Sequence, residues 1–162
     1  DRAIEIARRT GLKLKLAAKI GDGDRAYFEE VVQPMIDGDR VEYVGEISED
    51  QKSGFLGNAA ALLFPIDWPE PFGLAVIEAM ACGTPVMAWS CGAMPEIIDY
   101  GATGFVVETI EDAVATMPAL LQLDRRRVRA VFERRFSADR MATDYVAAYS
   151  RLISSHEQSR AS

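Results

Sequence analysis

Residues 60–88 read AALLFPIDWPEPFGLAVIEAMACGTPVMA, and this stretch decides the fold. Ala60–Pro65 is a continuous apolar run of strand length, and Thr84–Ala88 is a second one. Between them, the almost wholly apolar Gly73–Cys82 is expected to form a helix. Two strands joined by a helix run parallel, and apolar strands of this kind are covered on both faces. The stretch therefore predicts a buried strand–helix–strand unit.

The same alternation of strand and helix continues on both sides of this unit. The further elements that the sequence predicts are a helix ending at Gly11, a strand at Leu12–Ala18, a helix from Asp24 to Met35, a strand at Val41–Val44, a helix capped by Ser48 and Gln51, a helical turn at Met94–Ile98, a strand at Gly104–Val107 and helices up to Ser154. Strands interleaved with helices predict an α/β fold with a doubly wound, Rossmann-like parallel sheet.

Length, charge and hydropathy narrow the class of protein. A chain of 162 residues is the size of one domain with a real core. Its net charge of −7 has the wrong sign for a nucleic-acid partner, and its longest apolar stretch is far shorter than a transmembrane helix. Cys82 and Cys91 form neither a disulfide framework nor a zinc motif, and the first residues do not resemble a signal peptide. We expect a cytoplasmic protein.

Chemistry concentrates at the start of the central helix. Gly73 lets a ligand approach the backbone, and the unpaired N–H groups at the helix start lie at the positive end of the helix dipole, which favours an anion. Glu78 stands inside an otherwise uncharged helix, where a buried carboxylate needs a partner. Glu70 lies just before the helix, so we expect both carboxylates to face one crevice. Two acceptors beside an anion site suit a sugar nucleotide.

Glu70, seven intervening residues, Glu78 and then AMACGTPV resemble the C-terminal half of the retaining glycosyltransferases of family 4, also called group 1, which have the GT-B fold. The resemblance extends to Val44–Ser48, Gly92–Glu96 and Asp99–Phe105. Ala93 replaces the second glycine of the family's usual segment.

The resemblance implies a role for each matching residue. It assigns Glu70 to the hydroxyls of the donor sugar, as the catalytic residue, and Glu78 to the ribose of the nucleotide. It turns three consecutive backbone amides towards the diphosphate, those of Phe72, Gly73 and Leu74. The implied donor is a UDP-, GDP- or ADP-sugar, used with retention of configuration and without a metal or other cofactor.

By the same resemblance, Ile47 would hold the base through its backbone, with Lys52 nearby.

The resemblance also implies parts that lie outside this chain. The family's first strand of this domain, its basic loop and the acceptor-binding N-terminal domain would precede Asp1. We therefore expect residues 1–136 to form a partial nucleotide-sugar-binding domain, 137–154 a C-terminal helix and 155–162 a frayed tail. The chain alone is not expected to be active, and any peripheral membrane attachment would depend on the missing half.

Several alternatives stay open beside this hypothesis. The fold could serve a non-catalytic sugar-nucleotide or protein-binding module, or a GT-B sugar-nucleotide epimerase. Glu70 could simply complement the helix dipole, and Glu78 could be a buried ion-pair partner. Asp22-Gly-Asp24 and Asp37-Gly-Asp39 resemble a metal motif, although turn roles are preferred. The arginines of residues 125–135 are most simply a solvated helix face. The base, the sugar, the acceptor (a sugar, a glycan or a lipid-linked group) and the oligomeric state are not specified by the sequence.

Overall fold

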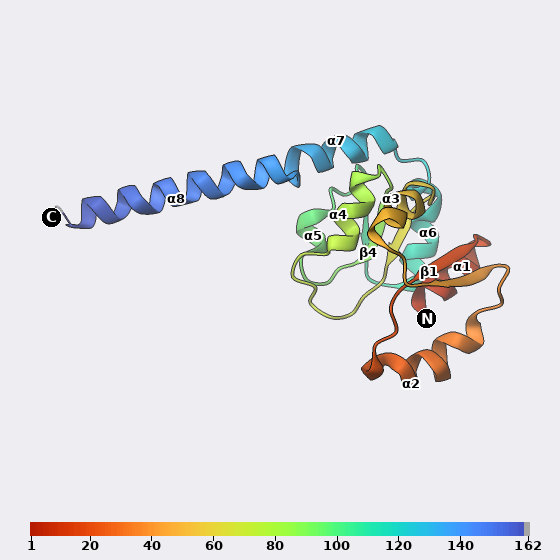
Figure 1. Cartoon of the computed structure of the whole chain (residues 1–162). Helices are drawn as coiled ribbons and strands as arrows, with labels where there is room; N and C mark the ends of the chain where they lie inside the picture. The colour runs from red at the N-terminus through yellow and green to blue at the C-terminus, as the bar shows by residue number, and fades with distance from the viewer. Residues whose placement is uncertain (161–162) are drawn as a thin grey trace.

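The computed structural model describes residues 1–160, with side chains up to His156 (Figure 1). In chain order its elements are α1 (Arg2–Thr10), β1 (Leu14–Ala17), η1 (Asp22–Asp24), α2 (Arg25–Tyr27), η2 (Phe28–Val32), η3 (Gln33–Met35), β2 (Val41–Gly45), α3 (Glu49–Gly57), β3 (Leu62–Phe64), α4 (Leu74–Ala81), β4 (Val86–Trp89), α5 (Met94–Ile97), β5 (Gly104–Val107), α6 (Ile110–Leu120), α7 (Arg125–Arg135) and α8 (Ala138–Arg160). The strand–helix–strand unit predicted from residues 60–88 is present as β3, α4 and β4.

The strands of the described residues form two parallel sheets, β1-β2 and β3-β4-β5. The predicted α/β alternation with parallel strands is confirmed, but the single predicted sheet is divided in two.

The burial of β3 reflects this division. Its residues Leu62, Leu63 and Phe64 are all apolar, yet each remains only half-buried, whereas most of β4 is buried. The N–H of Leu62 donates to the carbonyl of Pro85, the residue before β4, and Leu62, Leu63 and Phe64 lie in register with the first three residues of β4.

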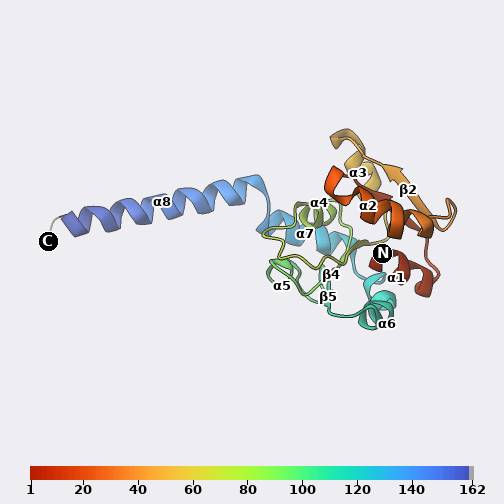
Figure 2. The ribbon, with the colours of Figure 1, turned by 90° about the horizontal axis from the view of Figure 1, so that it is seen from below.

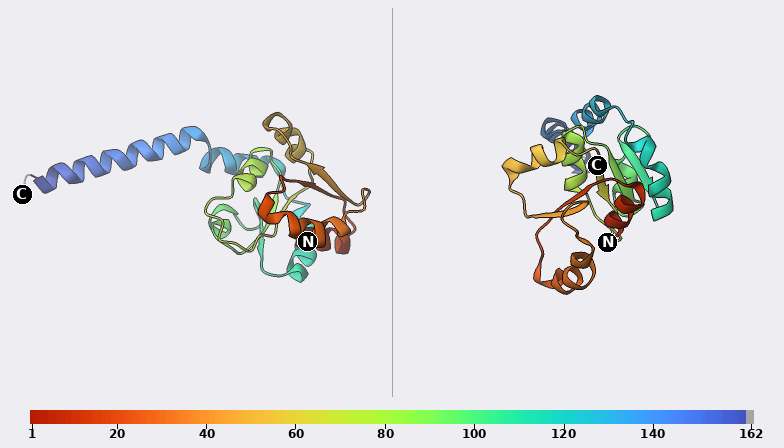
Figure 3. Two further views of the ribbon diagram at one scale, coloured as in Figure 1. Left: turned by 60° about the horizontal axis from the view of Figure 1, so that its bottom comes forward. Right: turned by 90° about the vertical axis from the view of Figure 1, so that its right-hand side faces the viewer.

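Helices cover both faces of the three-stranded sheet. On one face α4 packs against α3 and α7, and on the other α1 packs against α6, as the two views of Figure 3 show. Met80 of α4 and Met94 of α5 are fully buried in the first core cluster, and Met87 of β4 lies in the second. These two cores hold β4 and the segments that follow it in a fixed position.

The predicted helix from Asp24 to Met35 is wrong in detail. The segment is divided into α2, the π-helical η2 and the 3-10 helix η3. Pro34 explains the change, because a proline within the last turn lacks an N–H and its ring clashes with the carbonyl four residues earlier. The apolar period of Phe28, Val31, Val32 and Met35 gave no indication of this interruption.

The arginines of α7 are not simply a solvated face. Arg125 donates to the carbonyls of Gly57 and Ala59 and to the hydroxyl of Thr84, which is fully buried. Arg135 donates to the carbonyl of Ile97 and pairs with Asp99. These guanidinium groups therefore attach α7 to the loops beneath it.

Helix α8 leads away from the rest of the molecule in both views (Figures 1 and 2). It begins after Ser137, whose hydroxyl accepts from the N–H of Arg140, and continues to Arg160. The helix thus extends beyond Ser154, where we expected a frayed tail to begin, and residues 161–162 lie outside the described residues. Its exposed large apolar side chains are Met141, Tyr145, Val146, Tyr149, Leu152 and Ile153. Within the described residues, no helix has both the length and the apolar character to cross a membrane.

Candidate functional site

The site begins in the loop that joins β3 to α4. Gly73 ends this loop with a positive φ of 74°, a backbone conformation that side chains other than glycine rarely adopt. A Cβ at this position would also lie 2.6 Å from Cε of the fully buried Met94. Glycine is therefore required twice at the start of α4, once for the backbone angle and once for space.

Glu70 is held by two hydrogen bonds to its carboxylate. The backbone N–H of Gly73 donates to Oε1 at 3.0 Å, and the indole Nε1 of Trp68 donates to Oε2 at 3.2 Å. These donors favour the charged form and lower the pKa of Glu70, with the Gly73 N–H contributing most and Trp68 next. Glu70 thus complements the helix start, which was one of the alternatives for this residue. It is also fixed as an ionised hydrogen-bond acceptor.

This capping changes the set of amides that are free for an anion. Of the three predicted donors Phe72, Gly73 and Leu74, the Gly73 N–H is already occupied by Glu70, and the Phe72 N–H also helps to lower the pKa of this carboxylate. Within the described residues, the N–H groups of Leu74 and Ala75 have no hydrogen-bond acceptor. The first turn of α4 therefore keeps two backbone donors at the positive end of its dipole.

A turn after β4 fixes the backbone on either side of Glu70. The N–H of Ala93 donates to the carbonyl of Glu70 at 2.9 Å, and Sγ of Cys91 lies 3.0 Å from the carbonyl of Trp68. Gly92 has a positive φ of 56° and lies so close that a Cβ would be 2.3 Å from the carbonyl oxygen of Glu70. Gly92 lies in a segment that the family resemblance covers, but the contacts of Trp68 with Glu70 and of Cys91 with Trp68 arise only on folding and carry no sequence signal.

Glu78 lies in the second turn of α4 and is paired with a lysine. Its side chain is 37% exposed, and its Oε1 lies 3.1 Å from Nζ of Lys52 on α3. Lys52 also pairs with Glu49 at 2.7 Å, and these two carboxylates, Glu49 first, raise the pKa of Lys52. Glu78 is therefore half-exposed rather than buried, and its pairing need is met by a lysine, while its contact with a ligand stays a prediction.

Ile47 and Lys52 lie at the start of α3, directly after β2. Ile47 is half-buried and precedes the capping residue Ser48, whose N–H donates to Oε1 of Gln51 at 2.9 Å. The structure thus joins Lys52 to Glu78 and joins Trp68 and Gly73 to Glu70. The convergence of Glu70 and Glu78 on one ligand stays a prediction, as does the role of Ile47.

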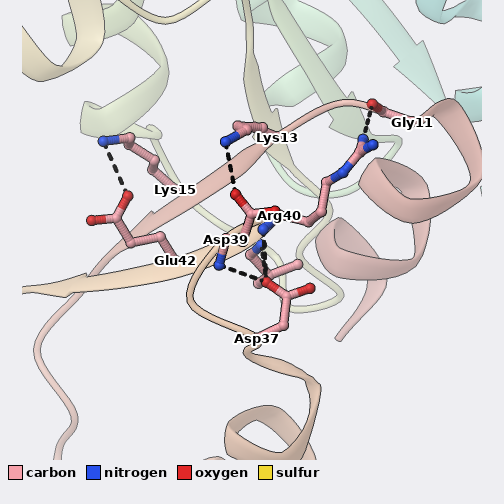
Figure 4. A network of polar contacts seen from close by, with 8 residues as sticks. Gly11, Lys13, Lys15, Asp37, Asp39, Arg40 and Glu42 are labelled. Atoms are coloured by element: carbon pink, nitrogen blue, oxygen red, sulfur yellow. Dashed lines mark hydrogen bonds and ion pairs between the residues drawn. The ribbon is translucent and has the colours of Figure 1, made fainter.

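The aspartates of the Asp37-Gly-Asp39 segment form a turn (Figure 4). Oδ1 of Asp37 accepts from the backbone N–H groups of Asp39, Arg40 and Val41 at 2.7 to 2.9 Å, while Asp39 pairs with Lys13 at 3.0 Å. The N–H groups of Val41 and Asp39 contribute most to lowering the pKa of Asp37. Among residues 1–160, no group of three or more His, Cys, Asp or Glu side chains is placed to hold a metal ion.

The turn at Asp37 leads to a prediction about pH. Because the pKa of Asp37 is lowered on folding, its contribution to stability is complete above the unfolded value of about 3.9 and is lost as the pH falls through the folded value. Asp37→Ala should therefore lower Tm at pH 7, and the difference from the parent protein should shrink below pH 4. Asp39→Ala, which removes only an exposed ion pair, should change Tm little. Equal Tm values for Asp37→Ala and the parent at pH 7 would contradict the assignment.

The comparisons with known proteins agree on one family. Residues 2–123 match the family model described as glycosyl transferases group 1. D-inositol 3-phosphate glycosyltransferase of Streptomyces scabiei is 35% identical over 103 residues, covering 64% of this chain and 19% of the relative. N-acetyl-alpha-D-glucosaminyl L-malate synthase of Bacillus anthracis is 27% identical over 140 residues, covering 80% of this chain and 36% of the relative.

A solved structure shows the same arrangement. AviGT4, a glycosyltransferase involved in avilamycin A biosynthesis, superposes with a TM-score of 0.78 at 27% identity, covering 95% of this chain and 47% of AviGT4. This chain therefore spans less than half the length of each of these three proteins.

Proposed function

Since the chain belongs to the group 1 glycosyl transferases, with the GT-B fold of its structural neighbours, we propose that it binds the nucleotide-diphosphate-sugar donor of such an enzyme. The observation that carries this proposal is the ionised Glu70 carboxylate, fixed beside the free amides of a helix start. An acceptor for hydroxyls and a site for an anion thus lie next to each other, which is the combination that a sugar diphosphate requires.

Glu70 would bind hydroxyls of the donor sugar. A carboxylate has about four lone-pair sites, and the protein uses one on each oxygen of Glu70. The remaining sites can accept hydrogen bonds from two sugar hydroxyls without moving the side chain. The family resemblance assigns the same role to this residue.

The free N–H groups of Leu74 and Ala75 would receive the diphosphate. Negative charge develops on this leaving group as the bond to the sugar breaks, and oriented amides at a helix start stabilise such charge without reorganising. The Gly73 N–H supports this site indirectly, because it holds Glu70 in place.

Glu78 and Lys52 would together bind the nucleoside. Glu78 can accept hydrogen bonds from the ribose hydroxyls, while Lys52 keeps its carboxylate ionised and oriented. Ile47, at the start of the same helix α3, would contact the base through its backbone. Retention of the anomeric configuration, independence of a metal and transfer to an acceptor are proposed for the full-length enzyme, as the resemblance implies.

Titration of the chain with UDP, GDP and ADP, followed by amide NMR shifts, tests the proposal. We expect one nucleotide to bind in the millimolar range, worth about 4 kcal/mol, with shifts at the start of α4 and around Lys52. Glu78→Ala should weaken that binding about tenfold, since a charge-assisted hydrogen bond to the ribose is lost.

Glu49→Ala is the matched control for this titration. Glu49 contacts the same lysine but is 84% exposed and has no proposed contact with the nucleotide. Its loss should leave binding within about twofold of the parent chain. A well-folded chain that shows no shifts with any of the three nucleotides up to ~10 mM, a range that covers the expected affinity, would overturn the proposed function.

A further inference from the structure

We propose that Trp68 is a positioning residue for Glu70, whose indole N–H fixes the carboxylate so that its free lone pairs face the donor sugar. The part of this inference that concerns the sugar rests on the proposed function of Glu70. The part that concerns the orientation of the carboxylate rests on the structure alone.

The indole of Trp68 is exposed, but its polar atom has a partner within the protein. The side chain belongs to a residue that is 55% exposed, and its single donor, Nε1, lies 3.2 Å from Oε2 of Glu70. An indole N–H can only donate, so this contact requires an acceptor. A large side chain that contributes little to the core therefore has one specific polar contact, and that contact is with the candidate catalytic carboxylate.

The backbone of Trp68 is anchored independently of its ring. The Trp68 carbonyl accepts from the N–H of Glu70 at 2.8 Å and lies 3.0 Å from Sγ of Cys91. Pro69 and Pro71 follow Trp68 and Glu70, and a proline restricts both its own φ and the backbone of the residue before it. The indole thus projects from a short segment with few accessible conformations.

Two donors at different positions define the plane of the carboxylate. The Gly73 N–H alone would hold Oε1 and leave Glu70 free to rotate about that contact. The second donor, on Oε2, removes this rotation. The two hydrogen bonds also favour the ionised form, which agrees with the lowered pKa of Glu70. Positioning by Trp68 therefore has two separable effects, one on titration and one on sugar recognition.

Trp68→Phe removes the N–H while keeping an aromatic ring, and it is the variant of choice. We expect the pKa of the Glu70 side chain, followed by carboxyl NMR on the selectively labelled 162-residue chain, to rise towards the ordinary value of about 4.3. We also expect the affinity for the sugar nucleotide to fall roughly fivefold relative to that for the nucleotide alone, with UDP against UDP-glucose, GDP against GDP-glucose and ADP against ADP-glucose as the pairs.

Trp89→Phe is the matched control, because it deletes the same N–H at the end of β4. That ring lies under the guanidinium of Arg2 at 5.9 Å and packs on the second core cluster. It should change neither the titration of Glu70 nor the preference for the sugar nucleotide. If both variants lose stability but only Trp68→Phe changes the pKa of Glu70 and the preference for the sugar nucleotide, these changes do not come from destabilisation.

The outcomes distinguish this inference from the proposed function. An unchanged pKa of Glu70 in Trp68→Phe would overturn the positioning role, whatever the ligands do. Parallel weakening of nucleotide and sugar nucleotide would overturn the role in sugar recognition. If the parent chain binds none of the six ligands, the proposed function fails, while the titration of Glu70 still decides whether Trp68 fixes its carboxylate.

Discussion

Gly104→Ala is expected to destabilise the fold by roughly 3 kcal/mol, the upper part of the range for overpacked core positions. Gly104 opens β5 and pairs with Val86 of β4, the central strand of the three-stranded sheet. A Cβ at this glycine would lie 1.9 Å from the carbonyl oxygen of Val86. Because Gly104 and Val86 lie on paired strands, the clash can be relieved only by separating β5 from β4. Strand β4 contributes residues to both core clusters.

The measurement is urea unfolding, which gives the free energy of unfolding for each variant. Gly54→Ala is the matched control, since Gly54 lies within α3 and a Cβ there meets nothing within 4 Å. The same chemical change should stabilise the protein by about 0.5 to 1 kcal/mol at this helical position. Equal effects of the two variants would show that β4 and β5 are not paired at Gly104 as described.

Gly92→Ala should abolish the preference for a sugar nucleotide over its nucleotide. The added Cβ would meet the backbone of Glu70, at 2.3 Å from its oxygen and 2.5 Å from its nitrogen. Relief of this clash moves Glu70 and breaks the hydrogen bond from Ala93, so the carboxylate leaves its position beside Gly73. The nucleotide itself should still bind, because Glu78 and Lys52 are not touched.

The control must separate the clash from backbone strain. Gly101 has a similar positive φ of 71°, and a Cβ there meets nothing within 4 Å. Both alanine variants should lose about 1 kcal/mol to the left-handed conformation. Only Gly92→Ala should alter the carboxyl shift of Glu70 and the paired titrations with UDP and UDP-glucose, GDP and GDP-glucose, and ADP and ADP-glucose. A Gly92→Ala protein with parent-like selectivity would exclude the turn after β4 as a support for Glu70.

The sequence predicted the elements that carry strong apolar patterns. Gly104–Val107 is β5 with the predicted bounds, and α4 lies within the predicted Gly73–Cys82. Both segments supply buried apolar residues to the core, so their composition reports on their environment. The predicted family is confirmed as well, since residues 2–123 match its model. That prediction rested on the motif around Glu70 and Glu78.

Contacts between distant segments could not be predicted in the same way. The pairing of Lys52 with Glu78 joins residues on different helices, and the contact of Cys91 with Trp68 joins two loops. Neither has a period or a spacing that a single sequence reveals. The sequence predicted one doubly wound sheet, and only the pairing of the strands shows that the described strands form two.

The exposed helix α8 has a thermodynamic consequence. In proteins, a helix draws most of its stability from packing of its apolar face, and that packing is lacking along α8. The apolar residues of α8 remain exposed, so its opening and closing are largely uncoupled from the unfolding of the two cores. Hydrogen exchange along the chain should therefore show two cooperative units. Any surface that covers Tyr145, Tyr149 and Leu152 would stabilise the outer unit by its own binding free energy.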